Sequence, residues 1–295
     1  MKVFQYGRII LEHHTYCNRK CDWCLAKHMK AYDLNNIKYM SEETLNIILN
    51  EIYNNIHLFK TDKLTFSLFR YNEPLFDYEY LIKIAKEIKS FFHNKNIDTY
   101  IYIHTNSDFL SPFVFEKVME VIDEITINNY ENLNFEQSLD KLEKQIGNNC
   151  KYLQLETCNI KENNRSRIYF SYKGKSVTVF LNSGKDLQIT TRGSYLQNFT
   201  KNNLINNGKI RTYDCDLKDR VLVIDYDGTV VNCCEISSRI PEHNTMILGN
   251  IREGLNVIHK KHVKNIFQEP CCKYCHMTSE ICGYIDENTE YKVGD

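Results

Sequence analysis

The sequence predicts an α/β fold with a parallel sheet, followed by a small cysteine-bearing domain. Two observations predict this. Strand-like apolar runs alternate with helical patterns through the first half of the chain, and cysteines gather in two groups near opposite ends. Repeated βα units imply a parallel sheet, as either an open barrel or a doubly wound sheet.

The strand and helix alternation begins with a β-branched run directly before the first cysteines. Ser41 has a side chain preferred at a helix N-cap, and Pro112 suits the first position of a later helix. The expected strands are Ile9–Leu11, Lys63–Leu68, Asp98–Ile103, Glu124–Ile127 and Tyr152–Glu156. The expected helices are Thr44–His57, Tyr78–Phe92, one opening at Ser111-Pro112, and Phe135–Ile146. Each helix carries apolar residues at helical spacing.

The alternation stops after the fifth of these strands. Cys158–Lys175 is polar, so we expect it to be irregular, with one further strand at Ser176–Leu181. Two β runs, Arg220–Ile224 and Thr229–Asn232, then flank an Asp-Gly pair that ends at Gly228, which is a strong hairpin signal. We therefore expect a boundary near residue 205, between a core of residues 1–205 and a small cysteine-bearing domain of residues 206–295.

Composition narrows the class of protein. The 295 residues include 37 Lys plus Arg and 38 Asp plus Glu, so no overall field attracts nucleic acid or an acidic membrane surface. The first residues lack a secretory signal, and no run of about eighteen apolar residues follows. These features predict a soluble, cytoplasmic protein. Twelve cysteines are many for such a chain, and in a reducing compartment clustered thiols indicate metal binding or catalysis.

The first cysteine group, Cys17-Asn-Arg-Lys-Cys21-Asp-Trp-Cys24, places three thiols on a loop directly after an expected strand. Three thiolates hold three irons of a cubane cluster and leave the fourth iron without a protein ligand, where a cofactor can chelate. The alternative is a structural zinc site. Zinc normally takes four ligands in tightly spaced pairs, and here the fourth would be His13, His14 or His28.

The spacing C-x3-C-x2-C, with Trp23 just before the last cysteine and a βα repeat after it, resembles the radical S-adenosylmethionine (radical SAM) superfamily. In that family the open iron of a [4Fe–4S] cluster binds the methionine part of S-adenosylmethionine (AdoMet). An electron from the cluster then splits the cofactor to a 5′-deoxyadenosyl radical. The resemblance implies a partial (β/α)6 TIM-like barrel for the core.

Three later segments fit the resemblance in order and position. Asn72-Glu73-Pro74 resembles the family's Gly-Gly-Glu-Pro segment, although Tyr71 and Asn72 replace its two glycines. His104 to Asp108 stands where family members often carry Thr-Asn-Gly, and Asn128 stands where a polar residue commonly contacts the cofactor. The resemblance implies cofactor binding by Trp23, Asn72, Glu73, Asn106 and Asn128. All follow strands at their carboxyl ends, where parallel sheets and barrels build their sites.

The second cysteine group has the pattern C-x12-G-x4-C followed later by C-x2-C. Its members are Cys215, Cys233, Cys272 and Cys275. Four thiolates fully ligate a cluster, and the pattern resembles the family's SPASM/twitch-type auxiliary-cluster extension, which implies a second [4Fe–4S] cluster and a small α+β domain. Cys234 and Cys271 are alternatives to Cys233 and Cys272. Zinc is the alternative metal for this group.

An auxiliary cluster can accept the electron left on a substrate, so the pair of groups predicts an oxidoreductase that performs a net two-electron oxidation. Only sixteen residues precede Cys17, too few for a leader-peptide recognition domain. That favours a small polar metabolite, such as a sugar or cyclitol derivative, over a peptide. Arg192 resembles an Arg-Gly segment found before the extension, and its guanidinium suits a substrate hydroxyl, carboxylate or phosphate; a surface salt bridge is the alternative.

The resemblance also implies a partner for the enzyme, and the sequence leaves two alternative functions open. The enzyme would need a reducing electron donor of the flavodoxin or ferredoxin type, and neither nucleic acid nor a membrane is an expected partner. The alternative functions are a peptide maturase that forms a side-chain cross-link, and an iron–sulfur or zinc redox or binding protein without AdoMet chemistry. Failure to bind AdoMet would favour the latter.

Overall fold

The structure, a computed structural model, describes residues 5–60, 63–131, 135–162, 165–181 and 221–265. Its strands are β1 (Arg8–Leu11), β2 (Leu64–Ser67), β3 (Thr99–Thr105), β4 (Glu124–Asn128), β5 (Leu153–Glu162), β6 (Arg165–Tyr172), β7 (Lys175–Leu181), β8 (Val221–Ile224), β9 (Thr229–Val231) and β10 (Ile247–Asn250). Its α-helices are α1 (Leu25–His28), α2 (Glu42–Asn54), α3 (Tyr78–His93), α4 (Pro112–Val121), α5 (Phe135–Ile146) and α6 (Leu255–Asn265). None of the described helices is both long and apolar enough to cross a membrane.

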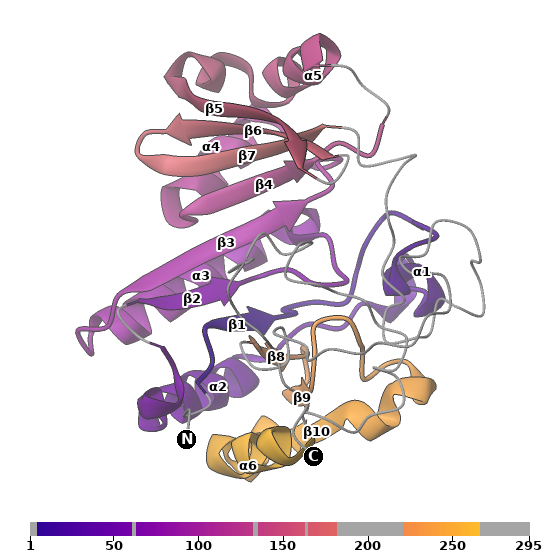
Figure 1. The fold of residues 1–295 in the computed structure, drawn as a ribbon, viewed down its shortest axis with the longest axis vertical. Helices are drawn as coiled ribbons and strands as arrows, with labels where there is room; N and C mark the ends of the chain where they lie inside the picture. Colours follow the sequence, from indigo (N-terminus) through magenta and orange to yellow (C-terminus); the bar gives the residue numbers. More distant parts are fainter. Residues whose placement is uncertain (1–4, 61–62, 132–134, 163–164, 182–220, 266–295) are drawn as a thin grey trace.

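The described strands form one sheet in the order β10-β9-β8-β1-β2-β3-β4-β7-β6-β5, which Figure 1 shows from the β10 end at the bottom to the β5 end at the top. Every neighbouring pair from β8 to β7 is parallel. The carboxyl ends of these strands therefore meet at one edge of the sheet, as the sequence predicts.

Two expectations about the outer strands were wrong. Tyr152–Glu156 was expected to continue the parallel series, and Cys158–Lys175 was expected to be irregular. Instead β5 and β6 form an antiparallel hairpin whose second strand pairs with β7, and β7 takes the parallel place beside β4. Only β5 is an edge strand, where less apolar burial is needed, whereas β6 lies inside the sheet and buries Ile168, Phe170 and Tyr172 at alternate positions.

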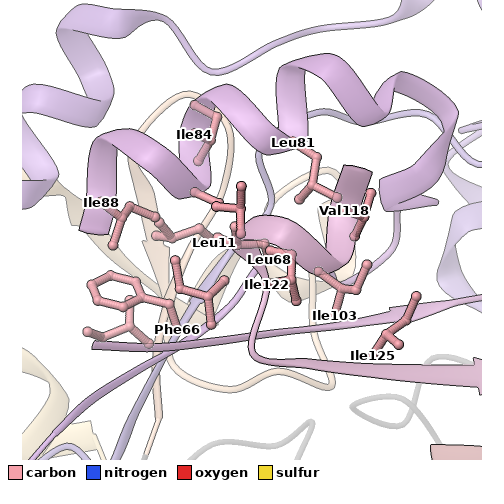
Figure 2. Packing of buried hydrophobic residues seen from close by; sticks show 14 of the residues in the cluster. Leu11, Phe66, Leu68, Leu81, Ile84, Ile88, Ile103, Val118, Ile122 and Ile125 are labelled. Carbon is pink, nitrogen blue, oxygen red and sulfur yellow. The ribbon is translucent and has the colours of Figure 1, made fainter. Parts of the chain in front are cut away.

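The helices α2, α3 and α4 pack on one face of the sheet because they carry apolar stripes. Figure 2 shows Ile84 and Leu81 of α3 above Phe66 of β2 and Ile103 of β3. The expected cap of α2 is present, and Pro112 opens α4 as expected. The Ser41 hydroxyl accepts the N–H of Thr44 at 3.0 Å, and Ser111 caps α4 in the same way. The opposite face of the parallel strands carries more polar side chains.

The predicted hairpin near residue 228 is confirmed, since β8 and β9 are antiparallel. Gly228 has φ of +86°, which glycine adopts readily, and its N–H donates to the carbonyl of Asp225 at 2.9 Å. Because β8 is parallel to β1, the sheet of the core continues into the C-terminal part. The expected boundary near residue 205 lies outside the described residues and stays a prediction.

Candidate functional site

The loop with Cys17, Cys21 and Cys24 lies between β1 and α1, and Figure 1 shows α1 on the side to which the arrow of β3 points. Backbone hydrogen bonds close this loop. The N–H of Cys24 donates to the carbonyl of Cys21 at 3.0 Å, and the N–H of Cys17 donates to the carbonyl of Ala31 at 3.0 Å. All three thiols are free and half-buried. The loop thus presents three thiols at the carboxyl edge of the sheet.

The chemistry of these thiols fits a multinuclear cluster. Burial, with a smaller contribution from neighbouring cysteines of the loop, raises the pKa of Cys17 to about 12 and that of Cys21 to about 11. Thiolates so close together need a compensating positive centre, which iron supplies. Among the described residues no three His, Cys, Asp or Glu side chains converge on a single ion. A cubane instead takes one thiolate for each iron.

Glu73, in the segment that follows β2, is buried beside this loop. Its carboxylate accepts three hydrogen bonds: from the Thr105 hydroxyl at 2.6 Å, from the N–H of Asn106 at 2.7 Å and from the N–H of Leu75 at 3.1 Å. Burial raises the pKa of Glu73 to about 7, and these hydrogen bonds limit the rise. A carboxylate held in this way is poised to bind a cationic group.

Asn106 joins Glu73 to the cysteine loop. Its side-chain amide nitrogen lies 2.8 Å from the Asn18 oxygen and 4.0 Å from the sulfur of Cys17. On the neighbouring strand, the amide of Asn128 donates to the carbonyl of Thr105 at 3.2 Å. The structure therefore brings together the cysteine loop and the ends of β2, β3 and β4, in the order that the sequence suggests.

Asn72 has a polar atom that no described residue satisfies. Its side-chain oxygen accepts the N–H of Arg70 at 2.9 Å, whereas its Nδ2 is buried without a hydrogen-bond partner in the described part of the chain. A buried donor of this kind costs free energy unless a ligand or water pairs with it. Asn72 is thus a donor available beside Glu73.

Aromatic and charged groups that sequence reasoning missed frame the loop. The ring of Trp23 lies 5.9 Å from that of Tyr130, and the guanidinium of Arg19 lies 5.1 Å from the same ring. Arg19 also binds Asp108 through two nitrogens, at 2.7 Å and 2.5 Å. Asp108 and Tyr130 could have been found from the sequence because they lie close to the motifs along the chain. Asp108 ends the segment that begins at His104, and Tyr130 follows Asn128 by two residues.

Of the second cysteine group the structure describes Cys233 and its alternative Cys234. Cys233 follows β9, is 5% exposed, and packs among apolar side chains that include Val231 and Ile236. Cys234 is half-buried beside it. Cys215, Cys272, Cys275 and Arg192 lie outside the described residues. The ligand set of this group, and the choice between the paired cysteines, stay predictions.

Comparison with known proteins identifies relatives by structure alone. No family model matches the chain, and no curated protein matches it. A structure of BtrN in complex with AdoMet and 2-DOIA shares 16% identity and a TM-score of 0.54 over 90% of this chain and 84% of that one. A structure of selenomethionine BtrN in an open conformation has 17% identity and a TM-score of 0.55, and the alignment covers 95% of this chain and 98% of that one. A structure of native anSMEcpe with bound AdoMet and the Kp18Cys peptide has 13% identity and a TM-score of 0.52, and the alignment covers 89% of this chain and 83% of that one.

At these identities the likeness shows the fold. The chain shares with BtrN and anSMEcpe an α/β fold built on a central parallel sheet, which confirms the α/β fold class predicted from its sequence.

Proposed function

We propose that this chain, which shares its α/β fold with BtrN and anSMEcpe, is a radical SAM oxidoreductase that dehydrogenates a small polar metabolite. The observation that carries the proposal is the junction of the Cys17 loop with Glu73 through Asn106. Three thiols, a buried carboxylate and a buried amide donor stand at one edge of a parallel sheet. Such an edge is where this kind of sheet binds ligands.

The residues at this edge have separate roles in the proposal. Cys17, Cys21 and Cys24 would hold a [4Fe–4S] cluster, which would supply the electron for reductive cleavage of AdoMet and so the radical chemistry that removes a hydrogen atom from the substrate. Glu73 binds the cationic amino group of the cofactor, because its carboxylate is already fixed by three hydrogen bonds. Asn72 offers its unsatisfied amide to a cofactor oxygen. The proposal assigns further contacts with the cofactor to Trp23, Asn106 and Asn128.

The remaining predicted residues complete the oxidation. A substrate alcohol that becomes a ketone loses a hydrogen atom, a proton and an electron. We assign the electron to a second [4Fe–4S] cluster on Cys215, Cys233, Cys272 and Cys275, and a substrate contact to Arg192. Residues 206–295 form the domain of that cluster. A flavodoxin or ferredoxin supplies the reducing electron, the protein acts in the cytoplasm, and neither nucleic acid nor a membrane takes part.

The proposed substrate class is a cyclitol or sugar derivative. It is supported by the likeness to BtrN, whose structure contains 2-DOIA, a cyclitol. A second candidate is maturation of a peptide by a side-chain cross-link, supported by the likeness to anSMEcpe with a bound peptide. The chain aligns over most of both neighbours, and the BtrN alignment has the higher TM-score.

A labelling experiment tests the proposal. The chain is reconstituted anaerobically with iron and sulfide, reduced with dithionite, and incubated with AdoMet and ring-deuterated aminocyclitols or sugars. We expect deuterium in 5′-deoxyadenosine and a product that is two hydrogens lighter, both measured by mass spectrometry. Transfer from a peptide panel but from no cyclitol or sugar would support the second candidate. Bound iron with no nucleoside would support a redox protein.

A further inference from the structure

Arg70 and Tyr71 lie at the end of β2, directly before Asn72 and Glu73, and their side chains extend to the C-terminal part of the chain. The Tyr71 hydroxyl donates to the backbone carbonyl of Cys234 at 2.9 Å. The Arg70 guanidinium donates to the carboxylate of Asp225 and to the carbonyl of Ile236. These partners are more than 150 residues away in sequence.

The ion pair between Arg70 and Asp225 is almost fully removed from solvent, with side chains 2% and 0% exposed. The second oxygen of Asp225 accepts the hydroxyl of Ser238. Buried charges of this kind hold a defined geometry, because breaking one partner leaves the other charge unpaired at low dielectric. The planar guanidinium also fixes direction as well as distance, which a lysine would not.

A second ion pair, between the half-buried Arg239 and the buried Glu12, ties the same C-terminal segment to the chain before the cysteine loop. Arg239 binds the carboxylate of Glu12 at 2.6 Å, and Glu12 is completely buried. Arg239 also lies 3.5 Å from the carbonyl of Thr15. Residues 225–239 are therefore held against the strand ends that carry both the cysteine loop and Glu73.

Residues 70–73 are held from two sides. On one side, Arg70 and Tyr71 bind residues 225–236. On the other, the N–H of Glu73 donates to the carbonyl of Tyr16 at 2.8 Å, next to Cys17. Asn72 connects the two, because its side chain accepts the N–H of Arg70. A shift of the backbone at Cys234 would thus reach Asn72 and Glu73 through a single tyrosine.

We propose that Arg70 and Tyr71 are positioning residues that couple AdoMet binding at Asn72 and Glu73 to metal binding at Cys233 or Cys234. This inference rests on the function proposed above. Metal ligation restrains the backbone at Cys233 and Cys234. The hydrogen bonds of Tyr71 and Arg70 then restrain residues 72–73, so the cofactor binds a segment that is already in position. Such coupling is reciprocal, so bound AdoMet favours metal at the second group by the same factor.

Four reconstituted full-length proteins test the coupling by equilibrium dialysis with AdoMet: the wild type, Cys233→Ala/Cys234→Ala, Tyr71→Phe, and the combination. Tyr71→Phe removes one hydroxyl and keeps the ring, so the fold is retained. We expect the double cysteine change to weaken AdoMet binding about threefold to tenfold when Tyr71 is present, which is the range of one hydrogen bond. In the Tyr71→Phe background it should have less than about a twofold effect.

Equal weakening in both backgrounds, or no weakening in either, overturns the coupling. Glu43→Gln is the matched control, since Glu43 contacts Arg252 at 3.3 Å and joins the same two parts of the chain at the surface. In the Glu43→Gln background the double cysteine change should still weaken AdoMet binding about threefold to tenfold. If Glu43→Gln abolished this effect as Tyr71→Phe does, the proposal would be overturned.

Amide hydrogen exchange on the same proteins separates this inference from the proposed function. Peptides covering residues 70–75 should exchange faster in the double cysteine variant than in the wild type, and the Tyr71→Phe background should not show this difference. If no protein binds AdoMet, the proposed function fails, and the exchange result still decides whether metal at the second group orders residues 70–75. Unchanged exchange there overturns the coupling.

Discussion

The carboxylate of Glu73 accepts the backbone N–H of Asn106 at 2.7 Å, which joins the ends of β2 and β3. The side-chain nitrogen of Asn106 in turn lies 4.0 Å from the sulfur of Cys17, on the loop that follows β1. Three neighbouring strands of one parallel sheet thus contribute adjoining groups to one place. This convergence, rather than any one motif, supports the proposed cofactor site.

Replacing Glu73 by Gln should weaken AdoMet binding by about tenfold or more, because it removes the charge that pairs with the amino group of the cofactor. Gln has nearly the same shape and needs no charge buried, so the fold should persist. Equilibrium dialysis with the reconstituted protein measures the effect. Glu79→Gln is the matched control, since Glu79 is exposed on α3. Equal affinities for both variants would remove Glu73 from the cofactor site.

Replacing Cys17, Cys21 and Cys24 by Ala should lower the iron content of the reconstituted chain by about four per molecule, because one cubane is lost. Cys150→Ala is the control. Cys150 is a half-buried free thiol that packs against the core, and its loss should leave the iron content unchanged. Retention of all the iron by the triple variant would refute the assignment of ligands.

Stability should fall as the pH drops below about 6.5, in part through His14. Burial lowers the pKa of His14 from 6.5 to about 4, and the nearby Asp77 opposes the shift only partly. The unfolded chain therefore binds a proton below pH 6.5 that the folded chain excludes, and the loss grows until about pH 4. At pH 5.5 this amounts to about 1 kcal/mol.

Urea unfolding of the wild type and His14→Gln at pH 7.5 and 5.5 measures this contribution. Carboxyl groups such as Glu73, with a raised pKa, change stability in the opposite direction, but they contribute equally to both proteins. The wild type should lose about 1 kcal/mol more than the variant on acidification. Identical losses would mean that His14 ionises freely in the folded state.

Replacing Phe66 by Ala should cost about 3–5 kcal/mol of unfolding free energy, because the change leaves a cavity between β2 and the helices. Phe66 is completely buried, and Figure 2 shows it beneath α3. Phe113→Ala is the control, since Phe113 is 57% exposed on α4. Urea unfolding should show a loss below about 1 kcal/mol for the control. Similar losses for both would contradict the packing described.

Local patterns were enough to predict much of the fold. The helix α5 spans Phe135–Ile146, the residues expected for it, because its apolar residues repeat at helical spacing. The hairpin at Gly228 followed from its turn residues. The β5–β6 hairpin was missed because the polar residues of Cys158–Lys175 mask the alternation of Ile168, Phe170 and Tyr172, which are buried in β6. Its pairing depends on a neighbouring strand, β7, which a polar composition does not reveal.

Some residues of the candidate site could likewise be predicted from local patterns, and others could not. Glu73, Asn106 and Asn128 were predictable because each follows a strand, and parallel strands end at one edge. Arg70 and Tyr71 were not, because their partners at Asp225 and Cys234 are more than 150 residues away and no local pattern marks a long-range pair. The departure from Gly-Gly at Tyr71 and Asn72 was visible in the sequence, but its structural consequence was not.

The most direct test of the central claim is the formation of 5′-deoxyadenosine from AdoMet by the reconstituted, dithionite-reduced chain, measured by chromatography and mass spectrometry beside the Cys17, Cys21 and Cys24 triple variant. We predict that the wild type forms the nucleoside and that the triple variant forms none above the background of dithionite alone. Equal amounts from both proteins, or none from a wild type that has bound its iron, would contradict the account.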